Sequence, residues 1–569
     1  MREARPAITV KRLPEFAILL PALALVSILL ALWGWGAHAR ALGLSSTDIL
    51  YRSLGAVGIS SLYETSRTWF GDWRLDLARM LGAVAFFLTI TSALTSLLRE
   101  QLRELAARWR RGHLIVIGDH AVARAIVEAG VRRRIRVTWI VGEGAKPEPM
   151  ARTIAVARRW DEGSAADFGA MHASQAVVAL GDEVEQIAVV RMLRAAVPAL
   201  PIAMNISDPW FADRLDAIEN ISNVRYVSLA GISVRQLHDR SPPFLVAQRL
   251  GHARLHALIV GCGRTGEATL HDLLLSQLTS FLGKPRITIV DPRAAEIAAS
   301  VLQRAPELAR SAEIHFVRPD HATDVRAIPA AELARAHGDC PFTLAYVALD
   351  GDLRTMGLGV SLQALARREG WHLGPIYTRL AAYGAFPNLA ASRAGGDAAG
   401  LIAWGDTRDF AEELGLFDGQ ADAMARAFHD AYAQAGPEGA GAVLPWEALG
   451  EEARQSNRHL LVHVPAKLAS IGVDVAAWLC AAADGPGGRA PPPIPELGAR
   501  PELVERLAAL EHARWATERR LCGWQHGDSR DNARRLHPGL VAWDALPEGD
   551  RAFNRAMVVA IVEASAKAA

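Results

Sequence analysis

The sequence predicts an α/β protein with membrane and all-α parts, and three observations lead to that fold class. Two long apolar runs stand near the start of the chain. In each of the two blocks that follow, a glycine turn succeeds an apolar strand and short apolar runs recur, as in doubly wound parallel sheets. Beyond Gly405 the pattern becomes helical. With 569 residues the chain has room for three or more domains, each with its own core.

The two apolar runs are expected to be transmembrane helices. Residues 16–37 carry no charge, and about 22 residues of helix cross the roughly 30 Å hydrocarbon layer of a membrane. Residues 77–98 form the second run, in which Arg79 stands near one end and can extend to the membrane surface. A cleaved signal peptide is the alternative for the first run, but that run is too long and a second one follows.

Positive residues flank the two runs on the sides that face away from the loop between them. They are Arg2, Arg5, Lys11 and Arg12 before the first run, and Arg99, Arg103, Arg108, Arg110 and Arg111 after the second. Cytoplasmic flanks carry the excess of lysine and arginine in membrane proteins. We therefore expect a multi-pass protein of the bacterial inner membrane, with both termini and the large domains in the cytoplasm.

The loop between the runs contains one further predicted helix, at residues 48–59. It is re-entrant or interfacial, and it stands where a two-helix potassium channel keeps its pore helix. No TVGYG sequence follows it, so a selectivity filter built from backbone carbonyls is not inferred. A helix outside the membrane with a purely structural use remains the alternative.

Charge, cysteine content and missing motifs argue against several classes of function. The net charge is +1, which gives no field toward nucleic acid. The cysteines Cys262, Cys340, Cys480 and Cys522 are far apart and form no CxxC pair, so neither a disulfide framework nor a zinc site is expected. No GxSxG, HExxH or P-loop occurs. We expect no catalytic residues and no metal, and an oxidoreductase linked to NAD is only a weak alternative.

The glycine turn at residues 261–266 is the centre of the nucleotide hypothesis, and we call it the second glycine turn. Gly261 makes the tight turn, Gly263 lets backbone amides approach a pyrophosphate, and Gly266 lets the helix pack on the strand. The phosphates would lie at the helix N-terminus, and Asp291, at the end of the next strand, would bind a ribose diol. NAD or another adenine nucleotide is the expected cofactor. Glycines kept for packing alone are the alternative.

A first glycine turn, residues 118–123, follows the strand 113–117. Gly118 keeps the first glycine, whereas His120 takes the position of close approach, so phosphate binding is less expected there. Further apolar runs stand at 137–141, 154–156, 176–179, 202–204 and 224–227, and in the second block at 287–290, 314–316, 344–348, 375–377 and 401–404. Both blocks therefore have six strands, which indicates an internal repeat. The candidate cofactor-binding residues are Gly261, Gly263, Arg264, Thr265, Gly266, Asp291, Arg293, Gly118, His120 and Asp350.

The first block resembles the TrkA-N domain, the Rossmann half of proteins that regulate potassium conductance. The resemblance is carried by residues 118–123, by the acidic segment 161–167, and by residues 176–183 and 189–196. It extends over residues 113–405 in two copies. The resemblance implies a nucleotide over the glycine turn and paired RCK-type domains that transmit its presence to membrane helices.

Residues 503–554 resemble the RyR domain, the repeat known from ryanodine receptors and also found in bacterial proteins. Matching positions include Glu511, His512, Trp515, Gly523, Trp524, Gly527, Arg530, Asp531, His537, Pro538, Trp543, Pro547 and Arg555. Ligand sensing is the role that this resemblance implies. The candidate ligand-binding residues are His512, Trp515, Trp524, Arg530, Asp531, His537, Trp543 and Arg555, which suit ring stacking and pairing with phosphates. A structural or partner-docking module is the alternative.

A second, degenerate copy of this repeat precedes it. His429 corresponds to His512, and Trp446 with Asn457 corresponds to Trp543 with Asn554. The two copies are expected to face each other across a cleft. The predicted domains are 1–112 (membrane region), 113–250 and 251–405 (Rossmann domains), 406–484 (degenerate RyR-like repeat), 485–498 (Pro/Gly linker) and 499–569 (RyR domain).

The predicted function is a membrane-anchored cytoplasmic nucleotide sensor that controls ion conduction or transport, with potassium as a candidate ion. Two spans per chain cannot enclose a pore, so a homo-oligomer is expected. The expected partners are the lipid membrane and a nucleotide-type small molecule, and no nucleic acid. The alternative is a membrane-tethered ligand-binding effector or scaffold without a pore.

Overall fold

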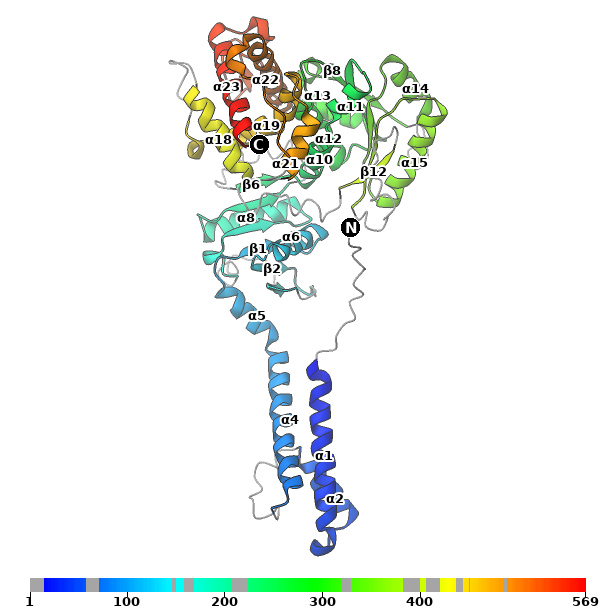
Figure 1. Cartoon of the computed structure of the whole chain (residues 1–569), viewed down its shortest axis with the longest axis vertical. Coiled ribbons are helices and arrows are strands. Elements are labelled where there is room, and N and C mark those ends of the chain that lie inside the picture. The colour runs from blue at the N-terminus through cyan, green and yellow to red at the C-terminus, as the bar shows by residue number, and fades with distance from the viewer. Residues whose placement is uncertain are drawn as a thin grey trace. The chain divides into compact units, whose positions relative to one another are not determined.

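A computed structural model describes residues 15–57, 71–145, 150–157, 168–206, 224–319, 329–381, 400–405, 420–435, 444–449, 451–484 and 489–568. The chain divides into two compact units, Met1–Ala106 and Ala107–Ala569, whose elements are labelled in Figure 1. The acidic segment 161–167, the end of the predicted helix 48–59 and part of the predicted linker lie outside the described residues.

The described part of the first unit consists of helices. They are α1 (Glu15–Leu42), α2 (Ser46–Gly55), α4 (Trp73–Leu97) and α5 (Arg99–Arg108), which continues into the second unit. Helices α1 and α4 lie side by side, with Ala31, Trp35, Leu75 and Ala78 buried. The Ser27 hydroxyl donates to the Ala78 carbonyl oxygen across 2.7 Å. The stretches Leu20–Leu42 and Trp73–Leu94 are long and apolar enough to cross a membrane, and they overlap the predicted runs.

Helix α2 turns back along α1 and α4. Ser45 caps its start, because its hydroxyl accepts from the Asp48 amide at 3.2 Å while the Asp48 carboxylate accepts from the Ser45 amide at 2.9 Å. At its other end, the Ala56 carbonyl lies so close to Gly82 that a Cβ atom there would collide with it. Gly82 stands nine residues beyond Trp73 (82 minus 73), which is about 14 Å along α4. The end of α2 therefore lies against α4, about 14 Å from the start of that helix.

The first sheet has six parallel strands in the order β3-β2-β1-β4-β5-β6. The strands are β1 (Leu114–Ile117), β2 (Val137–Val141), β3 (Thr153–Ala157), β4 (Gln175–Val178), β5 (Ile202–Asn205) and β6 (Val224–Val227). The helices between and after them are α6 (Ala121–Arg132), α8 (Glu183–Ala196) and α10 (Leu229–Arg240), with a short η2 (Ala170–His172). Along β1, Leu114 and Val116 belong to one core and Ile115 and Ile117 to another, so both faces are covered, as parallel sheets require.

The second sheet repeats this topology in the order β12-β11-β10-β7-β8-β9. Its strands are β7 (Arg254–Val260), β8 (Gly283–Val290), β9 (Glu313–Val317), β10 (Leu344–Val347), β11 (Ile376–Arg379) and β12 (Leu401–Trp404). Its helices are α11 (Pro243–Arg249), α12 (Arg264–Ser276), α13 (Ala294–Arg304), η3 (Leu308–Arg310), α14 (Ala330–Asp339) and α15 (Asp352–Arg368). Counted from its own first strand, each sheet has the order 3-2-1-4-5-6 of a Rossmann fold, so the predicted tandem of doubly wound sheets is confirmed.

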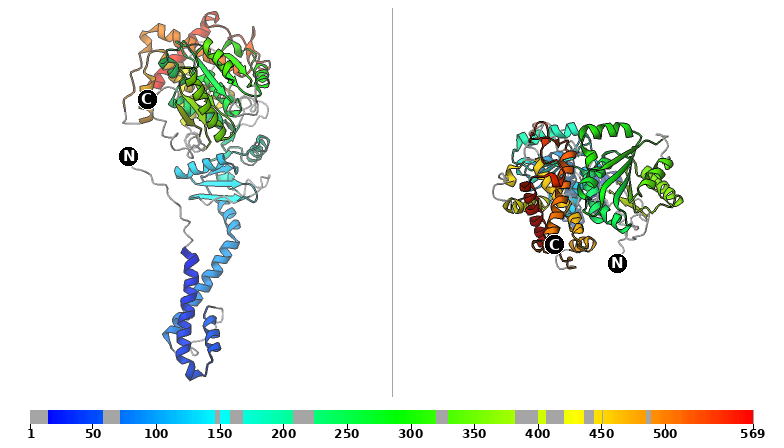
Figure 2. Two further views of the ribbon diagram at one scale, coloured as in Figure 1. Left: turned by 90° about the vertical axis from the view of Figure 1, so that its right-hand side faces the viewer. Right: turned by 90° about the horizontal axis from the view of Figure 1, so that it is seen from above.

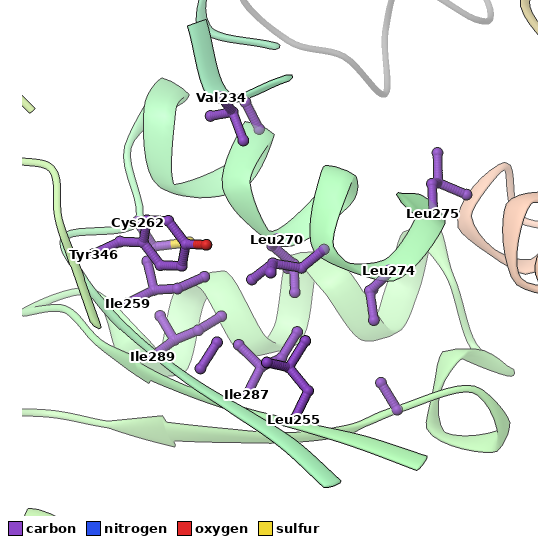
Figure 3. Packing of buried hydrophobic residues seen from close by; sticks show 14 of the residues in the cluster. Val234, Leu255, Ile259, Cys262, Leu270, Leu274, Leu275, Ile287, Ile289 and Tyr346 are labelled. Carbon is purple, nitrogen blue, oxygen red and sulfur yellow. The ribbon is translucent and has the colours of Figure 1, made fainter. Parts of the chain in front are cut away.

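Figure 3 shows why α12 is fixed on this sheet. Ile259, Ile287 and Ile289 point from the strands toward Leu270 and Leu274 of the helix, and all five side chains are buried. Burying a large aliphatic side chain contributes roughly 1.5–3 kcal/mol. The helix that starts at the second glycine turn is therefore held along its length.

The region beyond the second sheet is mostly helical. It contains α18 (Gln420–Ala435), η6 (Trp446–Ala448), α19 (Glu451–Val462), α20 (Val464–Ser470), α21 (Val475–Asp484), η7 (Leu497–Ala499), α22 (Pro501–Leu521), η8 (Trp543–Ala545) and α23 (Glu548–Ala568), with a short strand pair β13 (Gln525–His526) and β14 (Leu536–His537). Helix α22 packs against α12, and Figure 2 shows the helical region beside the second sheet. The His463 imidazole Nε2 donates to the Leu278 carbonyl at 2.7 Å, which joins α20 to the end of α12.

Candidate ligand sites

Two of the glycines in the second turn are required by close packing. Gly261 has φ +89°, and a Cβ atom there would lie 2.5 Å from the Ala348 carbonyl oxygen. A Cβ atom at Gly266 would collide with the carbonyl of Gly261, so only glycine lets α12 start this close to β7. These contacts explain Gly261 and Gly266 without any ligand.

Gly263 is different, because no packing contact explains it. It is the N-cap of α12 with φ −77°, and a Cβ atom there would meet nothing within 4 Å. Arg264 and Thr265 follow in the first turn of α12, and Arg264 is exposed. No hydrogen bond or ion pair joins Arg264 to another residue in the part of the chain that the structure describes. The open end of a helix, with its unpaired amides and this guanidinium, is suited to an anion.

Asp291 lies beside this turn at the end of β8 and is only 6% exposed. One carboxylate oxygen accepts from the Cys262 amide and the other from the Arg293 amide, each at 2.8 Å. The carboxylate thus holds the turn in place. The Arg293 guanidinium is mostly exposed, with its Nε 3.8 Å from Asp291, and Asp350 is exposed after β10. Burial raises the pKa of the Cys262 thiol to about 12, so this thiol stays neutral.

The first glycine turn carries a histidine, His120, at the position that Gly263 holds in the second turn. Gly118 has φ +141°, and a Cβ atom there would collide with the Ala179 carbonyl. His120 is the N-cap of α6, the position that Gly263 holds in α12. Its imidazole Nε2 lies so close to Gly181 that a Cβ atom there would collide with it. The imidazole therefore extends from the start of α6 to Gly181, which follows β4, while 57% of the side chain stays exposed.

A cavity of about 400 Å³ lies between the two helical repeats. We call residues 420–462 the upstream repeat and residues 499–568 the RyR repeat. The lining residues are His429, Leu449, Ala453, Ser456, Asn457 and Leu460 of the upstream repeat, and Glu511, His512, Arg514, Trp515, Arg519, His537, Gly539, Leu546, Asp550, Phe553, Asn554 and Met557 of the RyR repeat. A cavity therefore lies between the two segments that the sequence predicts to be copies.

The lining is itself duplicated. Five lining positions of the upstream repeat have a lining counterpart 97 residues later, the same interval that separates Trp446 from Trp543 (543 minus 446). The five pairs are Leu449 with Leu546, Ala453 with Asp550, Ser456 with Phe553, Asn457 with Asn554, and Leu460 with Met557. The sixth pair is His429 with His512. The same face of each repeat therefore faces the cavity.

The contacts within the repeats are duplicated too. His429 donates through Nε2 to the Leu444 carbonyl and His512 to the Val541 carbonyl, each at 2.9 Å. Each accepting residue stands two positions before the repeat's tryptophan, and each imidazole lies 5.9 Å from that ring. These two histidines thus hold a loop to a helix in both copies, which gives them a structural use.

Three of the eight predicted ligand-binding residues line the cavity: His512, Trp515 and His537. The His537 ring meets Trp515 edge to face at 4.9 Å. The other five lie outside the cavity lining. Trp524 is buried under His537, Arg530 bonds Asn532, Asp531 accepts from the Arg534 amide, and Trp543 and Arg555 both donate to Glu505. Their side chains are engaged in local contacts.

A buried cluster of charges forms the floor of the cavity. Arg514 is 1% exposed and donates to Glu511 at 2.7 Å and to Glu518 at 2.6 Å. The Lys467 ammonium lies 2.7 Å from Glu511. Burial alone raises the pKa of Glu511, but Arg514 and Lys467 outweigh it and hold this pKa well below its ordinary value. Burial also lowers the pKa of Lys467. Two acids and two bases thus neutralise each other.

This cluster also contacts the second sheet. Glu518 accepts from Ser456 at 3.0 Å and lies 3.1 Å from the His459 Nδ1 atom. The His459 ring stands 5.8 Å from the ring of His271 on α12. Burial lowers the pKa of His271 to about 3, which keeps it neutral. A continuous set of polar side chains therefore leads from the cavity to the helix of the second glycine turn.

Several lining residues were not among the predicted site residues, including Arg519, Phe553, Ser456, Asn457 and Asn554. The signal that would have found most of them is the duplication itself, since residues at equal positions in two facing copies line the same cleft. No group of three or more His, Cys, Asp or Glu side chains able to hold a metal ion occurs among the described residues.

Residues 499–566 match the model of the RyR domain family, which confirms the resemblance seen in the sequence. The chain is also similar to a crystal structure of GsuK bound to ADP, at 15% identity and a TM-score of 0.37, over 71% of this chain and 97% of that one. The GsuK channel bound to NAD is similar at 13% identity and a TM-score of 0.36, over 72% and 84%. A component of dipicolinate synthase from Bacillus halodurans is similar at 10% identity and a TM-score of 0.20, over 53% and 94%.

Proposed function

We propose that this protein is a membrane-anchored cytoplasmic sensor of an adenine nucleotide, NAD among the candidates, which controls ion conduction through a homo-oligomer. The nucleotide binds at the second glycine turn without being turned over. The observation that carries the proposal is the open N-terminus of α12, where Gly263 leaves free space, Arg264 supplies an uncommitted cation and Asp291 stands at the ribose position.

The form of the α12 end supports phosphate recognition in particular. A helix N-terminus presents amides that have no partner within the helix, and the helix dipole favours negative charge there. A Cβ atom at Gly263 would meet nothing within 4 Å, so a pyrophosphate has room to approach the backbone. The first glycine turn differs because His120 takes the place of Gly263 and its imidazole extends to Gly181. We therefore assign a nucleotide to the second glycine turn and none to the first.

The membrane unit supports control of conduction rather than simple anchoring. Helix α2 lies beside the two apolar helices, and Ala56 at its end packs against Gly82 of α4. A short helix that enters the bilayer without crossing it is tolerated where it is buried in protein or lines an aqueous path. Two spans per chain cannot enclose such a path, so several chains must assemble around it. The nucleotide changes the arrangement of the membrane helices only if it binds one conformation of the assembly more tightly than the other.

The competing function is a membrane-tethered effector or scaffold without a pore. The absence of a TVGYG sequence in the chain favours this alternative. Exchanging residues 15–97 for an unrelated two-helix anchor separates the two functions. A tether retains its cellular activity after the exchange, whereas a conduction element loses it.

Calorimetric titration of the full-length chain in detergent with NAD, NADH, ADP and ATP tests the nucleotide site. Gly263→Asp places a carboxylate where phosphates would lie, and we expect binding to fall below detection. Gly338→Asp is the matched control, since a Cβ atom there also meets nothing and the residue lies in the same Rossmann domain. Equal binding by both variants would remove the second glycine turn as the sensor. Unchanged nucleotide at the end of the titration supports binding without turnover.

A further inference from the structure

The two halves of the repeat cavity carry unequal side chains at equivalent positions. The upstream repeat has Ala453 and Ser456 where the RyR repeat has Asp550 and Phe553. The RyR side also supplies Trp515 and His537, whose rings meet edge to face. One half of the duplicated cavity therefore presents aromatic rings, and the other half has small residues that leave space opposite them.

The cations that line the cavity are engaged with neighbouring side chains. Arg514 directs its donors to Glu511 and Glu518, and Lys467 pairs with Glu511 behind the wall. The Arg519 guanidinium lies over the Trp524 ring, 5.7 Å from its centre. A polyphosphate needs several cations or helix amides directed at it, and the described lining does not gather them.

The polar groups that remain suit neutral hydrogen bonding. The Asn554 amide nitrogen donates one N–H to the Asp550 carbonyl of its own helix at 2.8 Å, which leaves its oxygen and its second N–H for a ligand. Asn457 makes the equivalent bond to the Ala453 carbonyl at 2.9 Å. At His537, Nδ1 accepts from the Gly539 amide at 2.9 Å, so the protonated Nε2 is the nitrogen left to donate. Rings, an acceptor and a donor together fit a planar heterocycle.

We propose that the repeat cavity is a second ligand site, separate from the glycine turn, and that it binds a planar nitrogen heterocycle of nucleoside type with at most one anionic group. Its ring packs against Trp515 and His537, and its N–H groups face the Asn554 oxygen. Ala453 and Ser456 leave the room that the ligand occupies. A cavity of about 400 Å³ lies within the roughly 300–1,000 Å³ of small-molecule sites.

The duplication suggests a substitution that fills the cavity with a side chain already present at the equivalent position of the other repeat. In Ser456→Phe the upstream repeat takes the residue that its counterpart already carries at position 553, so the helix and its packing accept it. The change also removes the hydrogen bond from Ser456 to Glu518. Ser456→Ala is the matched control, because it removes the same bond and leaves the space open.

The test is calorimetry on the full-length chain in detergent, with adenosine, guanosine, AMP and ATP as probes at two salt concentrations. We expect one equivalent of a nucleoside or monophosphate to bind, with little dependence on salt. Ser456→Phe abolishes this binding, whereas Ser456→Ala and Gly263→Asp keep it. Trp515→Leu weakens it roughly 5- to 150-fold, the range for loss of one ring stack.

Three results would overturn the proposal. One is that none of the four probes binds to the intact chain. Another is that, in the Gly263→Asp variant, ATP binds far more tightly than adenosine with a steep salt dependence, which would place a phosphate site in the repeat cavity. The third is that Ser456→Phe binds as the intact chain does. Because Gly263→Asp tests the glycine turn alone, failure at either site is distinguishable from failure at the other.

Discussion

Replacing Glu511 by glutamine is expected to destabilise the helical repeats, and the contacts of Glu511 give the size of the loss in unfolding free energy. Glu511 is fully buried, accepts from Arg514 at 2.7 Å and lies 2.7 Å from Lys467. Glutamine keeps the shape and removes the charge. Arg514 then keeps Glu518 as its counterion, while Lys467 is left as a buried ammonium without one.

The loss of stability in Glu511→Gln has an upper limit, because Lys467 can lose its proton instead of remaining a buried unpaired charge. Breaking a buried ion pair by removing one partner costs about 3–5 kcal/mol. The ammonium can escape by losing its proton, and from the ordinary lysine pKa of 10.5 this costs about 4.8 kcal/mol at pH 7 and about 2 kcal/mol at pH 9. In the variant the folded pKa of Lys467 lies below its unfolded value, so the variant gains stability as pH rises. We therefore expect a loss of about 3–5 kcal/mol at pH 7 that shrinks toward pH 9.

Glu505→Gln is the matched control, since it is the same substitution on the same helix. Glu505 also accepts from an arginine, Arg555 at 2.6 Å, but its side chain is 43% exposed. Such pairs contribute about 0–1 kcal/mol. Amide hydrogen exchange of α22 peptides measures both variants, and we expect Glu511→Gln to lower protection by roughly two to four orders of magnitude. Equal protection in the two variants, or a loss that grows toward pH 9, would refute the reasoning.

Two further predictions concern histidines, alongside the Gly263→Asp and Ser456→Phe tests above. Burial, reinforced by Lys467, lowers the pKa of His463 from 6.5 to about 4, so the unfolded chain binds more protons between these values. The free energy of unfolding should therefore fall as pH drops from 6.5 toward 4, and His463→Gln should flatten this slope in denaturant titrations followed across that range. His120→Gly should uncover the first glycine turn, and calorimetric stoichiometry should rise from one nucleotide to two; an unchanged stoichiometry would mean that His120 is not the obstacle.

The sheets show how far patterns of apolar residues can lead. Runs such as 137–141 and 344–348 coincide with β2 and β10, because a strand buried on both faces is mostly apolar. The sequence also predicted the need for two glycines of the second turn. The positive φ at Gly261 and the collision of a Cβ atom at Gly266 exclude other residue types. The position of Asp291 beside the turn follows from the parallel order of β7 and β8.

In the helical repeats, sequence patterns do not predict which side chains line the cavity. On α22, His512, Trp515 and Arg519 share one face, and Glu511, Arg514 and Glu518 share the next. Helical spacing groups these residues but does not say which group meets a cavity. Composition pointed to Trp543 and Arg555 as ligand groups, yet both bond Glu505. The choice depends on how α19 and α23 pack against α22.

The sequence by itself determined the two apolar helices, the paired six-stranded sheets, the glycine turns and the duplication of the RyR-like repeat, because each depends on local spacing and on burial along one segment. Tertiary structure alone decided that the His120 imidazole lies against Gly181, that Gly263 stays open, and that α2 turns back along its neighbours. It also decided that small residues of one repeat and aromatic rings of the other line the same cavity. These features depend on contacts between segments far apart in the chain, where side-chain volume and direction decide which space is filled.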